Sequence, residues 1–430
     1  MKLYIPTHPL IKALIHFRGN TRACVYTEPL WGITYNVFIT YASLYMIALG
    51  VSDAQIGMIT TLSLALQTLA AFLSGVVTDK IGRRWLTFIA DLVGWSTPAL
   101  IWAISQNVTW FIAAAIFNSF FRISMTAWTC LMVEDTDPEV LVDMYAWIYI
   151  FAITSAFFSP LSGWLIGIFG LVPAMRAIYF GACIMFTIKA TALFIFSKET
   201  SHGKVRMQET RGQSLLSMMG EYRGVLKELL KTPQTLYTLG LMTVMSITST
   251  ITSTFWSVLV AEKIHIPLDQ IAIFPLIRSL VMLGFFFGVL PRIGRLPFKR
   301  PMMWGYLTFI LGQVILILVP EKNIGMLAVS AVLDAFSLAM VSPQVDKLSI
   351  VTVDPEERAR IMSLLYIGTL IVSSPFGWIA GILSSIDKAF PFYLNITFYA
   401  LGILLTFFAA RLALKTGEDP LPASGGVDAA

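Results

Sequence analysis

Five ionisable side chains lie inside long apolar stretches of this sequence and are the first candidates for chemistry: Asp91, Arg122, Lys189, Arg278 and Asp334. A charged side chain near the middle of a bilayer costs roughly 2.5–3.5 kcal/mol even on lenient insertion scales, so each needs a partner or a water-filled cavity. A carboxyl group can take up and release a proton, and a guanidinium can hold an anion. We take Asp334 as the best candidate for a proton carrier.

Polar side chains recur at helical spacing around one of these arginines. Asn118 lies four residues before Arg122 and Thr126 four residues after it, and residues with this spacing share one face of a helix. The stripe indicates polar surroundings for Arg122. Binding of an anionic group and modulation of a neighbouring proton site are both open as its role.

Hydroxyl groups crowd the later stretch TVMSITSTITSTFWSV. They surround the helix, so some must serve backbone or packing roles. A set on one face, together with polar residues of an earlier stretch, forms the candidate substrate-binding group: Ser246, Thr250, Ser253, Ser257, Tyr35, Asn36 and Thr40, with Asn118 and Thr126. Such side chains, with one or two arginines, suit a polar or amphiphilic organic molecule, an anion included, and equally suit a sugar.

Membrane-spanning helices must position all of these residues. The chain is 57% hydrophobic and 13% charged, with a mean hydropathy of +0.75, whereas soluble domains are roughly 25% charged. A bilayer core needs about 20 helical residues. Apolar stretches of that length predict twelve spans, at residues 30–50, 55–78, 85–105, 108–132, 144–169, 173–197, 234–260, 269–290, 301–319, 324–346, 360–384 and 389–412.

The basic residues set the predicted orientation. Lys and Arg gather on the cytoplasmic side of inserted proteins, and with the N-terminus inside, the outer loops hold only Arg176, Lys263, Lys322 and Lys388. Both termini are therefore predicted to be cytoplasmic. The net charge of +5 comes from short tracts between apolar stretches, so nucleic acid is not an expected partner.

The chain divides into two similar halves. Segments beginning DPEVLVDMYAWIYIFAITSAFFSPLSGWLIG and DPEERARIMSLLYIGTLIVSSPFGWIAG share DPE, SP and GW at matching places, which indicates duplication. The glycines after each SP are interpreted as close-packing positions. We expect a cytoplasmic segment (1–29), a six-helix bundle (30–197), a loop with an amphipathic helix on the inner leaflet (198–233), a second six-helix bundle (234–412) and a disordered tail (413–430).

A motif after the second span carries a family resemblance. Gly75, Asp79, Lys80, Gly82, Arg83 and Arg84 resemble the signature G-x-x-x-D-[RK]-x-G-[RK]-[RK] of the major facilitator superfamily (MFS). The resemblance implies an all-α integral membrane protein with twelve transmembrane helices in two six-helix bundles.

The resemblance also implies roles. Asp79 is expected to latch the halves in the outward-facing state, near the start of the eleventh span, with Arg83, Glu134 and Asp135 as partners. The alternative is a loop that only fixes topology. A second copy around residues 288–295 lacks the acid, and the match of Pro160 and Gly163 to the antiporter signature is too partial to favour export over uptake.

The family fold places the intramembrane charges relative to one another. Its first, fourth, seventh and tenth helices line a central cavity, which implies that Arg122 faces that cavity. Arg278 and Asp334 are expected to form a salt bridge, either permanent and structural or broken by protonation or substrate. Asp91 and Lys189 are expected to pair at the outer back of the first bundle, with snorkelling of Lys189 as the alternative.

No Walker A sequence, HExxH motif or glycine-rich nucleotide fingerprint occurs, and the three cysteines are unclustered. We therefore expect no cofactor, no metal site and no enzyme activity. The leading interpretation is a monomeric, multi-pass secondary transporter of the plasma membrane, whose partners are a small organic solute, protons and the lipid bilayer. A non-transporting sensor and a lipid flippase on the same scaffold remain as alternatives.

Overall fold

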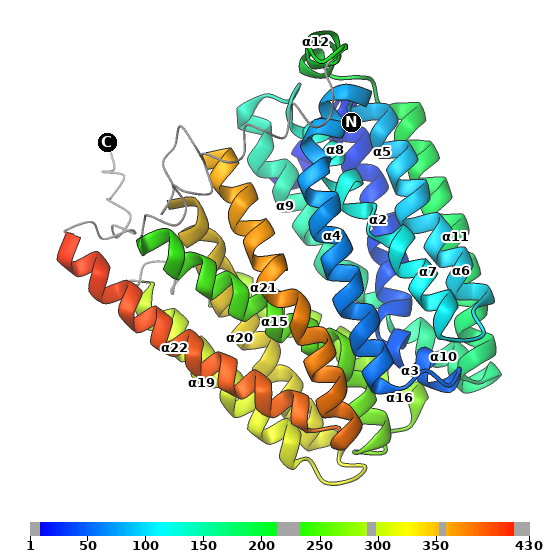
Figure 1. Ribbon diagram of the computed structural model, residues 1–430, viewed down its shortest axis with the longest axis vertical. Helices are drawn as coiled ribbons and strands as arrows, with labels where there is room; N and C mark the ends of the chain where they lie inside the picture. The colour runs from blue at the N-terminus through cyan, green and yellow to red at the C-terminus, as the bar shows by residue number, and fades with distance from the viewer. Residues whose placement is uncertain (1–8, 213–232, 290–297, 352–357, 417–430) are drawn as a thin grey trace, which may run out of the picture.

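A computed structural model describes residues 9–212, 233–289, 298–351 and 358–416 of the chain. Within these ranges the regular structure is entirely helical, and the helices form two bundles (Figure 1). The predicted amphipathic helix between the halves lies outside the described residues, as does most of the second copy of the loop motif. The final helix continues to Thr416, four residues into the tail that was predicted to be disordered, and the rest of that tail is not described.

The first bundle contains the segments from α1 to α11. They are α1 Pro9–His16, α2 Gly19–Ile39, α3 Ala42–Ala48, α4 Asp53–Ile81, α5 Arg83–Asp91, the π-helical η1 Leu92–Ser96, α6 Thr97–Ile104, α7 Val108–Asn118, α8 Phe121–Val133, α9 Pro138–Ser155, the 3₁₀ segment η2 Ala156–Phe158, α10 Pro160–Phe169 and α11 Leu171–Phe196. A short helix, α12 Ser201–Glu209, follows this bundle.

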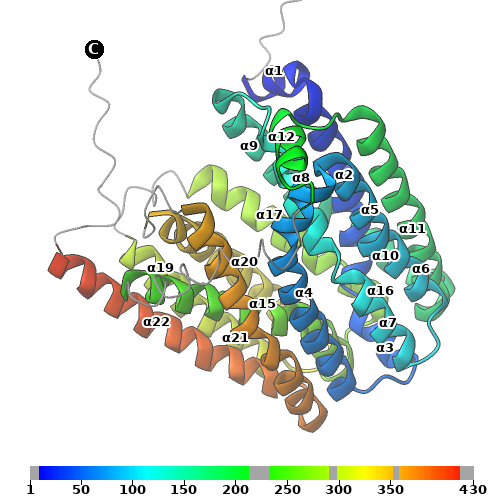
Figure 2. The ribbon, with the colours of Figure 1, turned by 45° about the horizontal axis from the view of Figure 1, so that its top comes forward.

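The second bundle contains the segments from α15 to α22. They are α15 Pro233–Glu262, α16 Leu268–Ile271, α17 Ile273–Gly288, α19 Lys299–Leu318, α20 Ile324–Val351, α21 Arg358–Ile386 and α22 Phe390–Thr416. Figure 2 shows the two bundles meeting along α4 and α21, and Figure 1 shows α12 at one end of the molecule. We call the opposite end, formed by residues 49–52, 105–107, 263–267, 319–323 and 387–389, the distal end.

Eleven segments of the described chain are long and apolar enough to cross a membrane, and they match the second to twelfth predicted spans. The first predicted span, 30–50, differs. Its helix begins at Gly19, and α2 and α3 are separated at Thr40 and Tyr41. Polar residues such as Asn20 and Glu28 lower the hydropathy of α2, which is why the helix start could not be found from an apolar pattern. The count of twelve spans stays a prediction.

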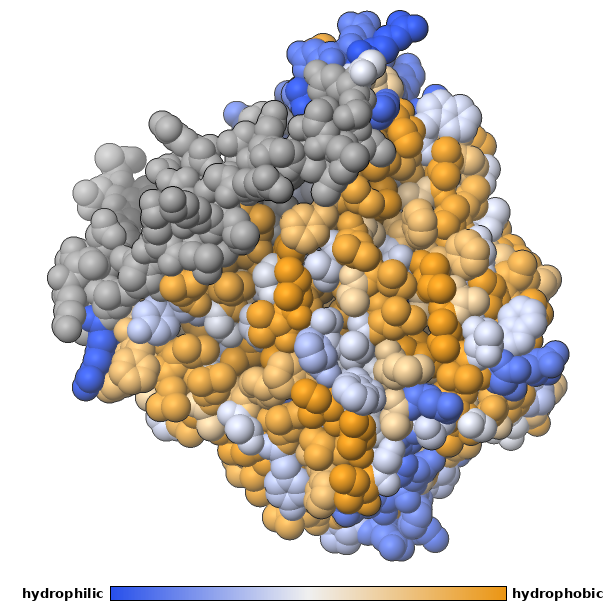
Figure 3. All heavy atoms as spheres, viewed as in Figure 1, coloured by the Kyte–Doolittle hydropathy of each residue, from blue (hydrophilic) through white to orange (hydrophobic). Residues whose placement is uncertain are grey.

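The outer surface is typical of a protein that lies in lipid. Large apolar side chains are exposed over a broad central region, while hydrophilic residues gather at the two ends (Figure 3). Trp164 is 62% exposed and Phe287 79% exposed. Exposed apolar surface on this scale is unfavourable in water but matches the acyl chains of a bilayer.

Glycines allow the two bundles to touch at the distal end. A Cβ atom added to Gly57 of α4 would meet the carbonyl oxygen of Gly377 at 2.4 Å and Cα of Gly381 at 2.8 Å, both on α21. One added to Gly163 of α10 would meet the carbonyl oxygen of Asp269 at 2.3 Å. The close-packing role predicted for the glycines after each SP pair is confirmed, and the contacts join the two halves.

We expect Gly57→Ala to destabilise the protein by about 1–3 kcal/mol, because the new methyl group overlaps the backbone of α21. Thermal unfolding in detergent measures this as a lower melting temperature. Gly181→Ala is the matched control, since a Cβ atom at Gly181 meets no atom within 4 Å. Equal melting temperatures for the two variants would contradict the close contact.

Candidate functional site

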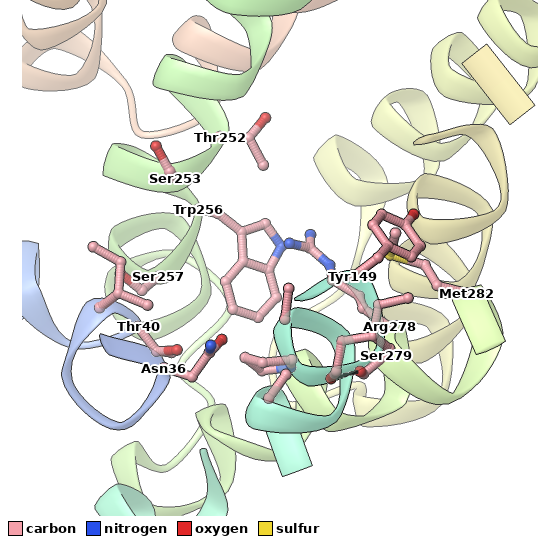
Figure 4. Close-up of a pocket in the computed structure, with 15 residues that line it drawn as sticks. Asn36, Thr40, Tyr149, Thr252, Ser253, Trp256, Ser257, Arg278, Ser279 and Met282 are labelled. Atoms are coloured by element: carbon pink, nitrogen blue, oxygen red, sulfur yellow. Dashed lines mark hydrogen bonds between the residues drawn. The ribbon is translucent and has the colours of Figure 1, made fainter. Parts of the chain in front are cut away.

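Three adjoining cavities share Ser253 of α15 in their walls, two of them lined by residues of both bundles and the third by residues of the second bundle alone. Their volumes are about 400, 470 and 150 Å³. The first is lined from the first bundle by Asn36 and Thr40 and from the second by Trp256 and Arg278 (Figure 4). Together the cavities form one candidate binding region, which we call the central cavity.

Arg122 of α8 faces the 470 Å³ part of the central cavity. Its Nε donates a hydrogen bond to Gln67 Oε1 at 3.0 Å. Its guanidinium carbon lies 4.6 Å from the centre of the Phe121 ring and 4.9 Å from that of Tyr366, a residue of the other bundle. Among the described residues, no carboxylate lies within ion-pair distance of Arg122.

The polar stripe around Arg122 is interrupted because α7 ends at Asn118 and α8 begins at Phe121. The Asn118 side chain lines the cavity but donates to the carbonyl oxygen of Gly94 at 2.8 Å, within the π-helical segment η1. Thr126 donates to Ser74 Oγ at 3.0 Å and to the Arg122 carbonyl at 3.2 Å. Thr126 therefore serves helix packing and lines none of the three cavities.

An ion pair stands on the other wall of the central cavity. Arg278 of α17 and Asp334 of α20 approach to 3.3 Å, and the Arg278 guanidinium carbon lies 4.9 Å from the centre of the Trp256 ring. Gln313 donates weakly to Asp334 at 3.5 Å, and Nε of Arg278 is buried without a hydrogen-bond partner in the described structure. The expected salt bridge is thus present, and its incomplete hydrogen bonding leaves room for a change of partner.

The other predicted cavity residues divide between binding and structural positions. Thr250, Ser253 and Ser257 line the cavities, whereas Ser246, on the same helix, lines none of the three. Asn36 donates to the carbonyl oxygen of Gly32 at 2.8 Å. Among the cavity-lining residues that sequence reasoning missed are aromatic and amide side chains for which no spacing rule existed: Gln67, Trp95, Tyr149 and Trp256.

The aromatic wall extends into the first bundle. Tyr35 stacks on Trp31 with ring centres 5.1 Å apart and meets Trp95 edge to face at 6.0 Å. Trp95 belongs to η1, and π-helical segments often mark functional sites because they turn a side chain out of helical phase. Here the segment presents Trp95 to the central cavity.

The loop-motif residues form a charged cluster at the α12 end. Arg83, 2% exposed, bonds Asp79 at 3.0 Å and Glu134 at 2.9 Å. The second carboxylate oxygen of Asp79 accepts from Arg206 of α12 at 2.9 Å. Hydrogen bonds to Asp79 and Glu209 raise the pKa of Arg206 above its ordinary value.

The remaining motif residues hold the turn and its surroundings. Gly82 has a φ of +93°, which a glycine adopts without strain, and Glu199 accepts from the backbone N–H groups of Arg83 and Arg84, each at 2.9 Å. Asp135 accepts from the backbone of Ser201, at the start of α12, at 3.1 Å. Gly75 and Lys80 lie within α4. Sequence reasoning missed Glu199 and Arg206, because no pattern links them to the motif.

A second charged cluster joins the halves at the distal end. Lys388 bonds Asp53 of the first half at 2.6 Å and Glu262 of its own half at 2.9 Å, and Ser384 donates to Asp53 at 2.5 Å. Burial acts to lower the pKa of Lys388, but the hydrogen bonds to both carboxylates raise it above its ordinary value. Lys388 therefore stays charged and its ion pairs persist near neutral pH.

Asp91 and Lys189 form a buried pair at the back of the first bundle. Their side chains meet at 2.6 Å, with relative exposures of 5% and 7%. Ser124 also donates to Asp91, and Glu28 lies within electrostatic range of the pair. Neither charged residue lines the central cavity, so the position favours the structural reading over snorkelling.

Comparison with known proteins now adds to this geometry. The family model described as Major Facilitator Superfamily matches residues 30–320 and 249–426. Among solved structures, the nucleoside transporter NupG is similar with a TM-score of 0.68 at 15% identity, covering 92% of this chain and 99% of that one. The comparison with curated proteins gives no significant match.

Two further solved structures cover 97% of this chain and 100% of their own. One is a bacterial homologue of the human lysosomal transporter Spinster in an inward-facing and occupied conformation, with a TM-score of 0.68 at 12% identity. The other is a mutant of the peptide transporter POT in complex with alafosfalin, with a TM-score of 0.67 at 14% identity. At these identities the likeness shows a shared fold.

The Asp91–Lys189 pair provides a test of the structural reading. We expect Asp91→Asn to destabilise the protein by about 3–5 kcal/mol, because it leaves a buried ammonium without its counter-charge. Combining it with Lys189→Met should restore much of the loss. Lys263→Gln, which breaks an exposed pair with Asp387, is the control, with an expected cost of about 0–1 kcal/mol. Thermal unfolding in detergent distinguishes these variants, and equal melting temperatures for Asp91→Asn and Lys263→Gln would contradict the structural reading.

Proposed function

The chain belongs to the Major Facilitator Superfamily, and from that membership we propose that it moves a small organic solute across the plasma membrane by proton-coupled alternating access. The family and the transporter structures that share its fold make it a multi-pass membrane transporter. The solute and the coupling ion are the proposed parts.

The observation that supports this mechanism best is the position of the central cavity. Its two larger parts take lining residues from both bundles, with Arg122 on one side and Arg278 on the other, and Asp334 lines the adjoining smaller part. A site between two halves can be reached from either side of the membrane when the halves rock about it. A cavity contained within one bundle would not support this mechanism.

The contacts between the halves favour an inward-facing assignment. The hydrogen bonds and ion pairs between described residues of opposite halves lie at mid-depth or nearer the distal end, among them Tyr41 to Leu268 at 2.5 Å, Thr61 to Ser374 at 2.7 Å and Lys388 to Asp53. The predicted topology makes the distal end extracellular. The halves are then joined on the outside, and the cavity would exchange solute with the cytoplasm.

The cluster around Asp79 fits the same assignment. Both of its carboxylate oxygens are held by cations of the first half and of α12, namely Arg83 and Arg206. We propose that, when the cytoplasmic side closes, one carboxylate oxygen of Asp79 changes its partner and bonds the second half near the start of α21. The loss of Asp79 would then affect the rate of the conformational change and leave the binding site intact.

Asp334 supports the proposed proton coupling. It is the one acid among the described lining residues of the three cavities, and its partner Arg278 also faces the solute space. Protonation of Asp334 would remove the counter-charge of Arg278, which could then turn to the solute. Proton binding and solute binding would in this way act on the same pair.

Reconstitution tests the function directly. Proteoliposomes with an imposed inward-acid or outward-acid pH gradient are incubated with a defined mixture of anionic, neutral and cationic metabolites, and mass spectrometry identifies the solutes that accumulate. The proposal expects at least one solute to accumulate above empty liposomes only with one direction of the gradient. Accumulation of none would overturn it.

For the solute so identified, we expect Asp334→Asn to lose accumulation driven by the pH gradient while keeping exchange of labelled for unlabelled solute, because a neutral side chain cannot cycle its proton. Asp387→Asn, in an exposed loop, should keep both activities. Gradient-driven accumulation at wild-type level in Asp334→Asn would remove this residue from the coupling step.

We expect Asp79→Asn to slow exchange about tenfold, the effect of losing one charge-assisted hydrogen bond in the closed state, with little change in affinity for the solute. Exchange rates in proteoliposomes and a thermal-shift titration measure the two quantities separately. Asp137→Asn, an exposed acid in another loop at the same end, is the control. A wild-type exchange rate would refute the gate role and leave a loop that only fixes topology.

A further inference from the structure

We infer that Arg122 binds the anionic group of the solute, and that the solute is an organic anion with a single negative charge and an aromatic or largely apolar body. The inference rests on the proposed transport function and names the substrate class of the same cavity. The carrying observation is an unbalanced positive charge in the cavity wall.

The charges of the described lining residues do not cancel. Arg278 and Asp334 neutralise one another at 3.3 Å, whereas Arg122 has no carboxylate within ion-pair distance in the described structure. A cation in a low-dielectric cavity is costly until a counter-charge arrives. A solute with one negative charge supplies that counter-charge, while a cationic solute would add to the imbalance.

The guanidinium of Arg122 also keeps donors for a ligand. Among the oxygen atoms of the described residues, the guanidinium bonds only that of Gln67, through Nε. The terminal nitrogen Nη1 contacts the sulfur of Met125 at 3.7 Å. This contact is weak, because a thioether sulfur is a poor hydrogen-bond acceptor. The two terminal nitrogens can therefore receive a carboxylate in the fork geometry that arginine provides and lysine does not.

The surroundings of Arg122 fit an apolar or aromatic body. Tyr35, Trp95 and Phe121 line the same 470 Å³ part of the cavity, a volume within the usual range for small-molecule sites. Ring faces accept flat or apolar groups, and polar side chains elsewhere in the wall, among them Ser63, Thr250 and Ser253, can hydrogen-bond to the solute. A highly hydroxylated sugar would leave some of its own hydroxyl groups without partners against the aromatic side chains.

The site also reaches both halves of the protein. The ring of Tyr366, on α21, lies 4.9 Å from the Arg122 guanidinium carbon. An anion on Arg122 is therefore placed where the halves meet. Its negative charge meets a ring face unfavourably, so binding should alter the contact between Arg122 and Tyr366.

The test compares solutes that differ only in charge. Wild-type proteoliposomes receive the metabolite mixture supplemented with phenylacetate and its neutral amide, and with indole-3-acetate and its neutral amide. We expect the accumulated solutes to be organic anions, with each acid preferred over its amide if its body fits the cavity. Arg122→Gln should reduce accumulation of the anions about tenfold or more and bring the acid and the amide of the same skeleton to similar levels.

Two further variants separate charge from folding. Arg122→Lys keeps the charge but loses the fork, so its KM for the anion should rise while maximal transport changes less. Arg176→Gln replaces an arginine outside the cavity, where its guanidinium donates to the Ser105 carbonyl, and should behave as wild type. If Arg122→Gln does not elute as a folded protein in size-exclusion chromatography, Arg122→Lys decides the question.

The outcomes distinguish this inference from the transport function. Accumulation of neutral or cationic solutes alone would overturn the anion inference and leave the transport function standing. Unchanged anion uptake in Arg122→Gln would have the same meaning. If Arg122→Gln does not fold, unchanged anion uptake in Arg122→Lys takes its place. Accumulation of no solute by the wild type would end both. Loss of anion uptake together with loss of the preference for acid over amide would establish Arg122 as the anion site.

Discussion

The cost of placing charge in an apolar medium governs this structure more than any other constraint. A charged group inside the membrane must meet an opposite charge, a set of hydrogen bonds or water. Asp91 and Lys189 satisfy the rule with each other, and Arg278 satisfies it with Asp334. These pairs join helices that are far apart in the sequence. Arg122 differs, because no carboxylate of the described residues pairs with it. It faces the central cavity, where a solute can supply the counter-charge.

The same constraint separates structural pairs from those that can change partner. The Asp91–Lys189 pair is short, buried and supported by Ser124, so every exchange of partners would expose a charge to apolar surroundings. The Arg278–Asp334 pair is longer, and Arg278 retains a buried nitrogen that has no partner among the described residues. Protonation or solute binding can alter the second pair at much lower cost than the first.

The sequence was sufficient for much of the fold and for part of the site. Eleven spans follow from apolar length alone, because the bilayer imposes one thickness on each helix. The contact of Arg83 with Asp79 follows from their spacing of four residues on consecutive turns. The contact of Lys388 with Asp53 joins residues 335 positions apart, and no local pattern encodes such a pairing.

One error in the predicted site comes from the interruption of a helix. The stripe of Asn118, Arg122 and Thr126 assumed one continuous helix, yet α7 and α8 are separated between Asn118 and Phe121. Asn118 and Arg122 still line the same part of the central cavity, whereas Thr126 is turned to Ser74. Only regular geometry can be extrapolated from spacing, and interruptions depend on tertiary contacts such as the bond of Asn118 to Gly94.

Alternating access requires that the two conformations have similar free energies, since a solute can shift their balance only by binding one more tightly than the other. The distal contacts stabilise the described conformation through Lys388, Asp53 and the glycines of α4 and α21. Opening that end loses these contacts, so the α12 end must supply contacts of comparable strength when it closes. Asp79 is suited to this exchange because it can change partner without losing its negative charge. In the proposed mechanism the two charged clusters therefore stabilise opposite conformations of one equilibrium, and the solute and the proton, bound between them, need only a small difference in affinity to shift it.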